Sequence, residues 1–190
     1  MKFRIEKKYR IISSNLHEFF RWLQLNNFNQ IYKKRSVSSV YYDNINMGMY
    51  NDSSEGVIPR KKLRIRHYDQ TKIFFKEEKL TTQNGEFKYS KKINILDNYE
   101  SLMDKNYGVC NKIFNIMYVR QYFLKENIRV TIDTDIKYQK INSEMIFGED
   151  KKFSNSVIEF KTSKIDDFNS IKDKIPLDEI RFSKYSNGVE

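Results

Sequence analysis

The sequence contains little cysteine, histidine, glycine or proline. Its single cysteine, Cys110, excludes an internal disulfide bond and a cysteine-based zinc site, and it fits the reducing cytoplasm. The two histidines, His17 and His67, are far apart and have no second ligand at metal-binding spacing. Six glycines and two prolines, against 13 tyrosines and 14 phenylalanines, argue against a disordered basic chain. We expect a folded protein with an aromatic-rich core, in which Cys110 is a small core residue.

Long apolar runs are also missing. No stretch approaches the ~20 apolar residues that are needed to span a bilayer. The first eight residues carry positive charge, but no apolar run follows them, so the pattern predicts no secretory signal. We therefore expect a soluble, cytoplasmic protein without a membrane segment.

Positive charge, in contrast, is abundant. The chain has 35 Lys and Arg against 25 Asp and Glu, which gives a net charge of +10. This excess points to an acidic or phosphate-rich partner. The 190 residues contain no internal repeat, linker or break in composition, so residues 1–190 are predicted to form a single domain.

Most of the chain has the two-residue period of strands with one apolar and one charged face. Near the start, for example, Ile5, Tyr9 and Ile11 alternate with charged residues. Asn84-Gly85, which lies between two such runs, predicts a hairpin turn. Further strands are predicted at Val37–Tyr42, Lys61–Tyr68, Lys72–Leu80, Phe87–Ile93, Tyr118–Leu124, Ile128–Asp133, Ile136–Ile141 and Val157–Lys161.

Three short segments have a helical period instead. Their apolar positions are Leu16, Phe19, Phe20 and Leu23; then Tyr99, Leu102 and Met103, with Asp97 as a cap; and finally Phe168, Ile171 and Ile175, ended by Pro176. A large antiparallel sheet with a few amphipathic helices places the fold in the α+β class.

The charged faces of the predicted strands carry cations on one strand after another. Lys62, Arg64 and Arg66 share one face of their strand, and Leu63 and Ile65 share the other. If the charged faces point inward, the strands form a closed antiparallel β-barrel with a polar basic lumen, covered outside by the amphipathic helices. Crowded cations repel one another, so such a lumen requires an anion or paired acids. A solvated charged face explains any one strand, but the whole set favours a phosphate site.

Eight short motifs follow one another along the chain. They are Arg4-x-Glu6-x-Lys8-Tyr9, Ser39-Val40-Tyr41-Tyr42-Asp43, Lys62-x-Arg64-x-Arg66-x-Tyr68, Glu77-x-Lys79, Tyr118-x-Arg120-x-x-Phe123, Arg129-Val130-Thr131-Ile132-Asp133, Glu159-x-Lys161 and Ser183-Lys184-Tyr185-x-x-Gly188. In this order and spacing the chain resembles the VTC domain, the catalytic domain of the vacuolar transporter chaperone polyphosphate polymerases. That domain belongs to the triphosphate tunnel metalloenzymes. The resemblance covers nearly the whole chain, from Phe3 to Gly188.

The resemblance implies an antiparallel barrel around a basic tunnel. It also implies a metal-dependent phosphotransferase, which moves the γ-phosphate of ATP to a growing inorganic polyphosphate chain with Mn²⁺ or Mg²⁺. Glu159 would hold the metal. The implied catalytic residues are Lys8, Arg64, Arg66, Lys79, Arg120, Arg129 and Lys184. Further phosphate contacts are expected from Lys62, Lys161, Arg181 and a lysine after the hairpin, either Lys91 or Lys92, with Lys92 as the candidate.

Two departures from the family pattern bear on the reaction. The hydrolytic CYTH branch opens with Glu-x-Glu-x-Lys, but this chain has Arg4 at the first acidic position. Losing that acid weakens the case for water activation and matches the polymerase branch. Arg181 stands where a lysine is expected, and this exchange changes the geometry of a phosphate contact. Glu6 is a metal ligand or the partner of a neighbouring arginine, and Glu77 is an acid that supports the metal or an ion-pair partner within the tunnel. We favour the ion pair for both.

Three functions remain open. The first is a polyphosphate polymerase, which needs no protein nucleophile because phosphoryl transfer depends on positioning and charge. The second is an inorganic triphosphatase or polyphosphatase on the same barrel, against which Arg4 argues. The third is a non-catalytic binder of polyphosphate or nucleic acid. Nucleic acid is disfavoured, because its binders place cations on an exposed helix or groove with stacking aromatics. The sequence predicts no oligomeric state.

Overall fold

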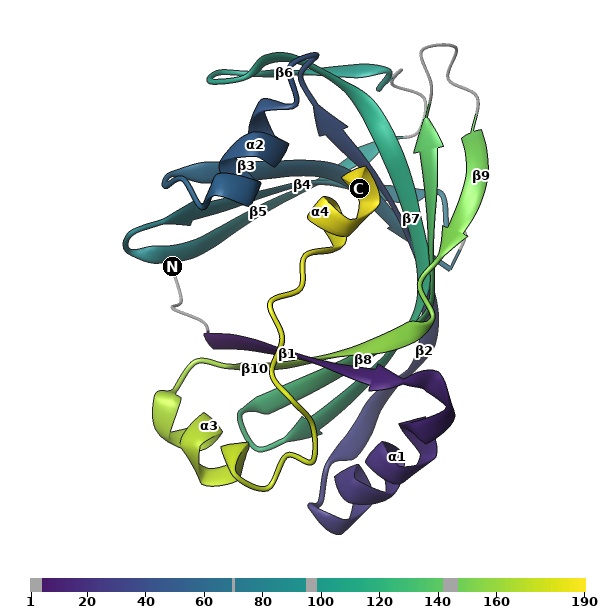
Figure 1. The fold of residues 1–190 in the computed structure, drawn as a ribbon, viewed down its shortest axis with the longest axis vertical. Helices are drawn as coiled ribbons and strands as arrows, with labels where there is room; N and C mark the ends of the chain where they lie inside the picture. The colour runs from purple at the N-terminus through teal and green to yellow at the C-terminus, as the bar shows by residue number, and fades with distance from the viewer. Residues whose placement is uncertain (1–4, 70, 95–98, 142–146) are drawn as a thin grey trace. The chain divides into compact units, whose positions relative to one another are not determined.

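The computed structural model describes residues 5–69, 71–94, 99–141 and 147–190 (Figure 1). In chain order the elements are β1 (Ile5–Ile12), the short 3₁₀ turn η1 (Ser13–Asn15), α1 (Leu16–Leu25), β2 (Asn29–Asp43), α2 (Gly48–Glu55), β3 (Arg60–Tyr68), β4 (Ile73–Thr82), β5 (Gly85–Asn94), β6 (Ser101–Asp104), β7 (Gly108–Lys125), β8 (Ile128–Ile141), β9 (Phe147–Lys152), β10 (Asn155–Thr162), α3 (Ile165–Lys172) and α4 (Lys184–Val189). The chain is therefore mostly strand, with a few short helices.

The chain divides into two compact units. Unit 1 draws on Met1–Arg35, Tyr118–Ile136 and Lys152–Phe182, and unit 2 on Ser36–Met117, Lys137–Lys151 and Ser183–Glu190. Strands β2, β7, β8 and β9 contribute residues to both units. The prediction of a single domain for residues 1–190 is not tested by this division and stays a prediction.

The strands hydrogen-bond in the order β1-β10-β8-β7-β2-β3-β4-β5, with β6 added to β7 and β9 added to β8. Among the described residues, β1 and β5 stand at the two ends of this order and do not pair. The antiparallel sheet predicted from the sequence is confirmed, but hydrogen bonds do not close it, so the closed barrel is not confirmed. None of the helices in the described part of the chain combines the length and apolar content needed to cross a membrane.

Unit 1 has the amphipathic layering that the sequence predicts. On β1, Tyr9 and Ile11 are buried, and they join a core to which α1 contributes Phe19 and Leu23. Helices α1 and α3 both lie on this apolar face of the strands (Figure 1). Burial of each large apolar side chain contributes about 1.5–3 kcal/mol, which explains why these two short helices form here. The predictions of helices at the first and third segments are confirmed, but α3 ends at Lys172, before Ile175 and Pro176.

The predicted helix around Leu102 is wrong. Residues 101–104 form β6, in which Leu102 pairs with Cys110 of β7. Leu102 is 7% exposed whereas Met103 is 73% exposed, which is the alternation of a strand. Three apolar residues within five positions are too few to distinguish the period of a helix from that of a strand. Pairing with β7 stabilises the strand. The proposed cap, Asp97, lies outside the described residues.

Unit 2 contains two helices that the sequence analysis missed, α2 and α4. Helix α4 packs on the cationic side of β3, because Tyr185 lies against Tyr41, with ring centroids 5.3 Å apart. Tyr41 is the register partner of Arg64, so α4 covers the face that carries the arginines. Helices were expected only on the outer, apolar faces, and α4 corrects that expectation for unit 2.

The other strand predictions are confirmed, and several strands are longer than predicted. The two runs predicted at Ile128–Asp133 and Ile136–Ile141 are one strand, β8. The hairpin at Asn84-Gly85 joins β4 to β5, where Thr82 pairs with Gly85. Gly85 has a φ of 117°, a conformation that residues with a Cβ rarely adopt. Cys110 is buried and free, as expected, and His17 is exposed on α1.

Candidate phosphate-binding site

Unit 1 places its charged side chains on one face of β1, β10, β8 and β7. Lys8 pairs with Glu159, which pairs with Thr131 on the next strand. Because directly paired residues project from the same side of a sheet, these three side chains share a face. We call it the unit 1 basic face; its members are Glu6, Lys8, Arg120, Arg129, Thr131, Asp133, Glu159 and Lys161.

Acids and cations alternate closely on the unit 1 basic face. Lys161 Nζ lies 3.0 Å from Glu6 Oε1 and 3.1 Å from Glu159 Oε2. One lysine therefore holds two carboxylates side by side. The ion-pair role predicted for Glu6 agrees with this contact, but the partner is Lys161 and not the arginine that was expected. Lys8 Nζ donates a hydrogen bond of 2.8 Å to the carbonyl of Phe182, which orients the ammonium group.

Arg120 is held by a two-point ion pair. Its Nε and Nη2 donate to the two carboxylate oxygens of Asp133 at 2.6 and 2.7 Å. Its guanidinium carbon also lies 5.2 Å from the ring centre of Tyr118. Burial alone would lower the pKa of Arg120, but Asp133 outweighs burial and raises that pKa. Arg120 is thus a fixed, permanently charged donor.

Two polar atoms of the unit 1 basic face lack a partner. Arg129 Nε and Thr131 Oγ1 are buried and make no hydrogen bond within the described part of the chain. An unsatisfied buried donor costs about 1–3 kcal/mol, which a ligand oxygen could recover. Both atoms lie on strand β8 on the face that carries Glu159, so this is where the face is best suited to bind an anion.

Unit 2 has a second cationic face, centred on Glu77 of β4. Arg64 Nη2 lies 2.6 Å and Arg66 Nη1 lies 3.6 Å from Glu77 Oε2. Glu77 is only 4% exposed. Burial by itself raises the pKa of Glu77, but the charges of Arg64, Arg66 and Lys88 outweigh burial and lower the pKa to about 2. The favoured prediction that Glu77 is an ion-pair residue agrees with this geometry.

The sequence analysis gave Tyr41 no role, although it quoted this residue in a motif. Arg64 Nη1 donates a hydrogen bond of 2.8 Å to the Tyr41 hydroxyl. Burial raises the pKa of Tyr41, but the charges of Arg64, Arg66 and Lys184 outweigh it, so the net shift is downward. A buried phenol surrounded by three cations marks a strongly positive local potential. The period-two pattern could have indicated it, because Tyr41 lies opposite Arg64.

The register of β4 and β5 resolves the choice between Lys91 and Lys92. Lys92 pairs with Phe75, which pairs with Arg66, so Lys92 shares the face of the arginines and Lys91 points to the opposite face. On the same face Lys79 pairs with Lys88, and Lys79 Nζ lies 2.6 Å from Glu86. Lys88, which the sequence analysis missed, contacts Glu77. The unit 2 basic face comprises Tyr41, Lys62, Arg64, Arg66, Glu77, Lys79, Lys88 and Lys92.

The C-terminal segment brings further predicted residues to unit 2. Lys62 Nζ donates a 2.9 Å hydrogen bond to Ser183 Oγ and lies 5.5 Å from the ring centre of Tyr185. The first residue of α4 is Lys184, whose charge acts on Tyr41. Arg181 belongs to unit 1 and is exposed. The predicted site residues therefore fall into two groups, one on each unit, and Arg4 lies outside the described residues.

The unit 1 basic face offers oxygen ligands that suit a hard divalent cation. The described residues contain no cluster of three or more His, Cys, Asp and Glu side chains. Glu159 and Glu6 nevertheless lie on either side of Lys161, and Thr131 Oγ1 lies opposite Glu159. Mg²⁺ is commonly held by one or two carboxylates with water and substrate phosphates. The donor set therefore fits Mg²⁺ or Mn²⁺ if phosphate and water complete the coordination.

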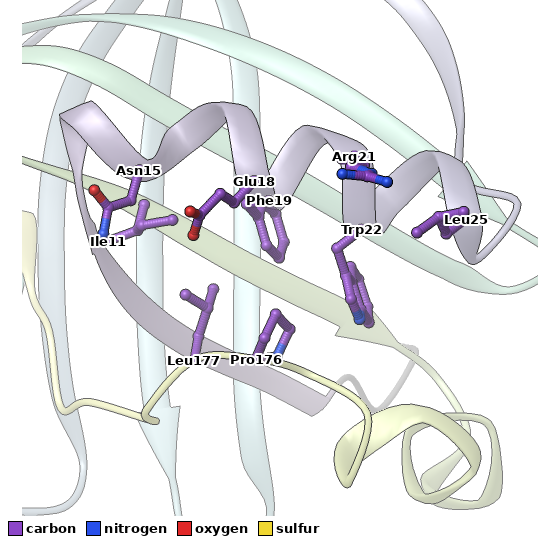
Figure 2. A pocket seen from close by; sticks show the side chains of 9 residues that line it. All are labelled: Ile11, Asn15, Glu18, Phe19, Arg21, Trp22, Leu25, Pro176 and Leu177. Atoms are coloured by element: carbon purple, nitrogen blue, oxygen red, sulfur yellow. The ribbon is translucent and has the colours of Figure 1, made fainter.

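A groove of about 320 Å³ lies elsewhere in unit 1, between α1 and the segment that follows α3 (Figure 2). Its lining includes Trp22, Leu25, Pro176 and Leu177. Most of this lining is apolar, so the groove does not suit a phosphate chain.

The fold is shared with solved structures of low sequence identity. A candidate adenylate cyclase from Vibrio parahaemolyticus is 17% identical over 97% of this chain and 96% of that chain, with a TM-score of 0.63. Another, from Bacillus halodurans, is 13% identical over 96% and 95%, with a TM-score of 0.63. A candidate adenylyl cyclase from Hippeastrum, described as having a dominant triphosphatase activity, is 16% identical over 97% and 94%, with a TM-score of 0.55. At these identities the likeness establishes the fold alone.

The family is established by a sequence model. The model of the VTC domain matches residues 3–107 and 88–190, which together span nearly the whole chain. The chain therefore belongs to the VTC domain family, as the eight motifs predicted. A search of curated proteins gives no match.

Proposed function

We propose that this protein is a polyphosphate polymerase, which transfers the γ-phosphate of ATP to the end of an inorganic polyphosphate chain. The observation that carries the proposal is the alignment of Lys8, Glu159 and Thr131 on three adjacent strands. An ammonium group and a hydroxyl group bind phosphate oxygens, and the carboxylate between them can hold a metal ion. Membership of the VTC domain family supports the choice of substrates.

The proposed phosphate contacts come from both basic faces. Catalytic contacts are proposed for Lys8, Arg120 and Arg129 in unit 1 and for Arg64, Arg66, Lys79 and Lys184 in unit 2; Lys62, Lys92, Lys161 and Arg181 are proposed to bind the polymer. A triphosphate tunnel, meaning a barrel closed around these cations, is part of the proposal and rests on the family resemblance. A cytoplasmic location is proposed from the single cysteine.

In the proposed reaction, a terminal oxygen of the polyphosphate chain attacks the γ-phosphorus of ATP. The bond between that phosphorus and the β,γ-bridging oxygen breaks, ADP leaves, and the chain grows by one phosphate. Charge spreads over the phosphoryl oxygens in the loose transition state, so fixed cations supply most of the catalysis. Lys8 is oriented by the Phe182 carbonyl, and Arg129 carries a buried unpartnered Nε, so both are suited to this role.

A divalent metal would be held by Glu159, together with water and phosphate oxygens. When bound, Mn²⁺ or Mg²⁺ would act as a Lewis acid and offset the charge that develops on phosphate oxygens. Lys161 would stay beside Glu159 and limit the net negative charge of the site. Because the described residues contain no group of three or more His, Cys, Asp and Glu side chains, phosphate and water would have to complete the coordination.

The direct test is an assay of chain growth. The full chain is incubated with ATP, MnCl₂ or MgCl₂ and a short polyphosphate primer, and the products are separated on a gel. The expected result is a ladder of lengthening chains, with one ADP released for each phosphate added. ADP release without chain growth, or neither product, would contradict the proposal.

An inorganic triphosphatase is the second candidate. It is supported by the shared fold with the Hippeastrum protein, which is described as having a dominant triphosphatase activity. Arg4 argues against it, because it replaces the first acid of the hydrolytic motif. Release of orthophosphate from tripolyphosphate, without chain growth, would select this alternative.

A further inference from the structure

We propose that Tyr32, Arg35 and Tyr122 of unit 1 form a binding site for the nucleobase of a nucleoside triphosphate. The inference rests on the proposed function, because it supposes that the phosphate donor is a nucleotide and not an inorganic triphosphate. None of these three residues belongs to the eight motifs, and none was predicted as a site residue from the sequence.

The three side chains are packed against one another at the surface. The rings of Tyr32 and Tyr122 meet edge to face, with centroids 5.6 Å apart and planes at 88°. The guanidinium carbon of Arg35 lies 5.1 Å from the ring centre of Tyr32 and 5.9 Å from that of Tyr122. Tyr32 is nevertheless 52% exposed. These contacts hold an aromatic ring in one orientation while leaving much of it open to solvent.

We call the cluster of Tyr32, Arg35 and Tyr122 the aromatic platform. Its Tyr122 lies on the face of β7 that carries the proposed phosphate contact Arg120. Tyr122 and Arg120 are two residues apart on β7, so both project from the same face. A strand rises about 3.4 Å per residue, which separates their Cα atoms by about 7 Å along the strand. A ribose spans a comparable length between a base and its first phosphate. One nucleotide can therefore place its phosphates at Arg120 and its base at Tyr32 and Tyr122.

The chemistry of the platform favours a base over further phosphate. Polyphosphate has no apolar or π surface, so an exposed tyrosine ring adds little to its binding. Nucleobases, in contrast, stack on aromatic rings and on guanidinium planes, and this stacking depends little on which base is bound. The guanidinium group of Arg35 lies close to both tyrosine rings, where it can add to the stacking of a base.

The test compares a nucleotide with its inorganic counterpart. Isothermal titration calorimetry measures the binding of ATP and of tripolyphosphate, each with Mg²⁺, to the full chain and to two variants. Tyr32→Ala should weaken ATP binding about tenfold and change tripolyphosphate binding less than about twofold. Tyr89→Ala is the matched control, because Tyr89 is 53% exposed and lies on β5 of unit 2. It should change neither affinity.

A fluorescent variant gives an independent readout. Tyr32→Trp keeps an aromatic ring at this position, and its emission should be quenched by ATP but not by tripolyphosphate. The wild-type protein, whose single tryptophan is Trp22, supplies the background signal. Equal losses of both affinities in Tyr32→Ala, no loss of ATP affinity, or quenching by tripolyphosphate as well as ATP would overturn the proposal.

The outcome is separable from that of the proposed function. If no chain growth occurs but ATP binding still depends on Tyr32, the polymerase proposal fails and the nucleobase site stands. If chains grow but Tyr32→Ala binds ATP as the wild type does, the polymerase stands and the nucleobase site fails. A wild-type protein that binds neither ligand would overturn both.

Discussion

The hydroxyl of Tyr185 donates a hydrogen bond to Oδ2 of Asp43, and each of these side chains is only 1% exposed. The same carboxylate accepts the backbone N–H groups of Met49 and Tyr50 at 3.0 Å, at the start of α2. Burial raises the pKa of Tyr185 and the charge of Asp43 raises it further, so the phenol remains a donor. One buried carboxylate thus fixes both α2 and α4, and α4 carries Lys184.

Tyr185→Phe should therefore destabilise the protein. The variant leaves a buried carboxylate with one donor fewer, and the expected loss is about 1–3 kcal/mol in the free energy of unfolding, measured by urea denaturation. Tyr89→Phe removes an exposed hydroxyl and should change stability by less than about 0.5 kcal/mol. A Tyr185→Phe variant as stable as the wild type would show that the hydrogen bond is not needed.

Gly188, the last residue of the C-terminal motif, is required by packing. A Cβ at this position would overlap the ring carbons of Phe114. Gly188→Ala should cost about 1–3 kcal/mol, because the ring cannot move without disturbing the core around it. The double variant Phe114→Leu/Gly188→Ala should cost less than the sum of the two single variants. Strict additivity would mean that the clash is relieved in some other way.

Glu77 should make stability depend on pH. Its pKa is about 2 in the folded state, against 4.5 for the ordinary group. Because the folded-state pKa is lowered, this stabilisation is fully present above about pH 4.5 and is lost as the pH falls toward 2. Glu77→Gln should cost about 3 kcal/mol at pH 7, and the difference from wild type should shrink to nearly zero near pH 2. Denaturation curves at several pH values give both quantities.

The matched control is Glu78→Gln. Glu78 is the next residue on β4, its side chain is 32% exposed, and its contacts with Lys61 and Lys76 are 3.9 and 3.7 Å long. Exposed ion pairs of this kind contribute about 0–1 kcal/mol. If both glutamine variants lost the same stability at pH 7, the buried network around Glu77 would not be the cause of the effect.

Glu159→Gln separates an enzyme from a binding protein. Loss of the proposed metal ligand should reduce chain growth by about 100-fold or more, because a bound metal contributes several kcal/mol to the transition state. Tripolyphosphate binding without metal should persist, since Lys161 retains its contact with Glu6. Glu179→Gln, which removes an exposed partner of Lys7, should keep full activity. Unchanged chain growth in Glu159→Gln would remove this residue from the mechanism.

Much of the site could be predicted from the sequence because its key pattern is local. The two-residue period of β1 and β10 places Lys8 and Glu159 on charged faces, whatever the strands' partners are. The two-residue pattern was ambiguous where the apolar run was short and where two lysines are adjacent in the sequence. It did not show whether Lys91 or Lys92 lies on the face of the arginines. It also predicted a helix where Leu102 and Met103 form the strand β6.

Contacts between distant segments could not be predicted in this way. Tyr185 and Asp43 are 142 residues apart, and Lys62 and Ser183 are 121 apart. Neither α2 nor α4 has a long apolar stripe, so their positions depend on Asp43 and on the packed rings of Tyr41, Phe114 and Tyr185. The cluster of Tyr32, Arg35 and Tyr122 likewise forms only when β2 and β7 lie side by side.

The charged faces of β1 and β10, most of the antiparallel strands and membership of the VTC domain family could all be predicted from the sequence. These features follow from backbone periodicity and from motif order, both of which are properties of the chain alone. The acid that accompanies each cation, in contrast, depends on how the chain folds. The tertiary structure pairs Arg120 with Asp133, Lys161 with Glu6 and Glu159, and the arginines of β3 with Glu77. The reason is physical: a buried charge takes the partner that folding brings within a few ångströms, and strand pairing sets that choice.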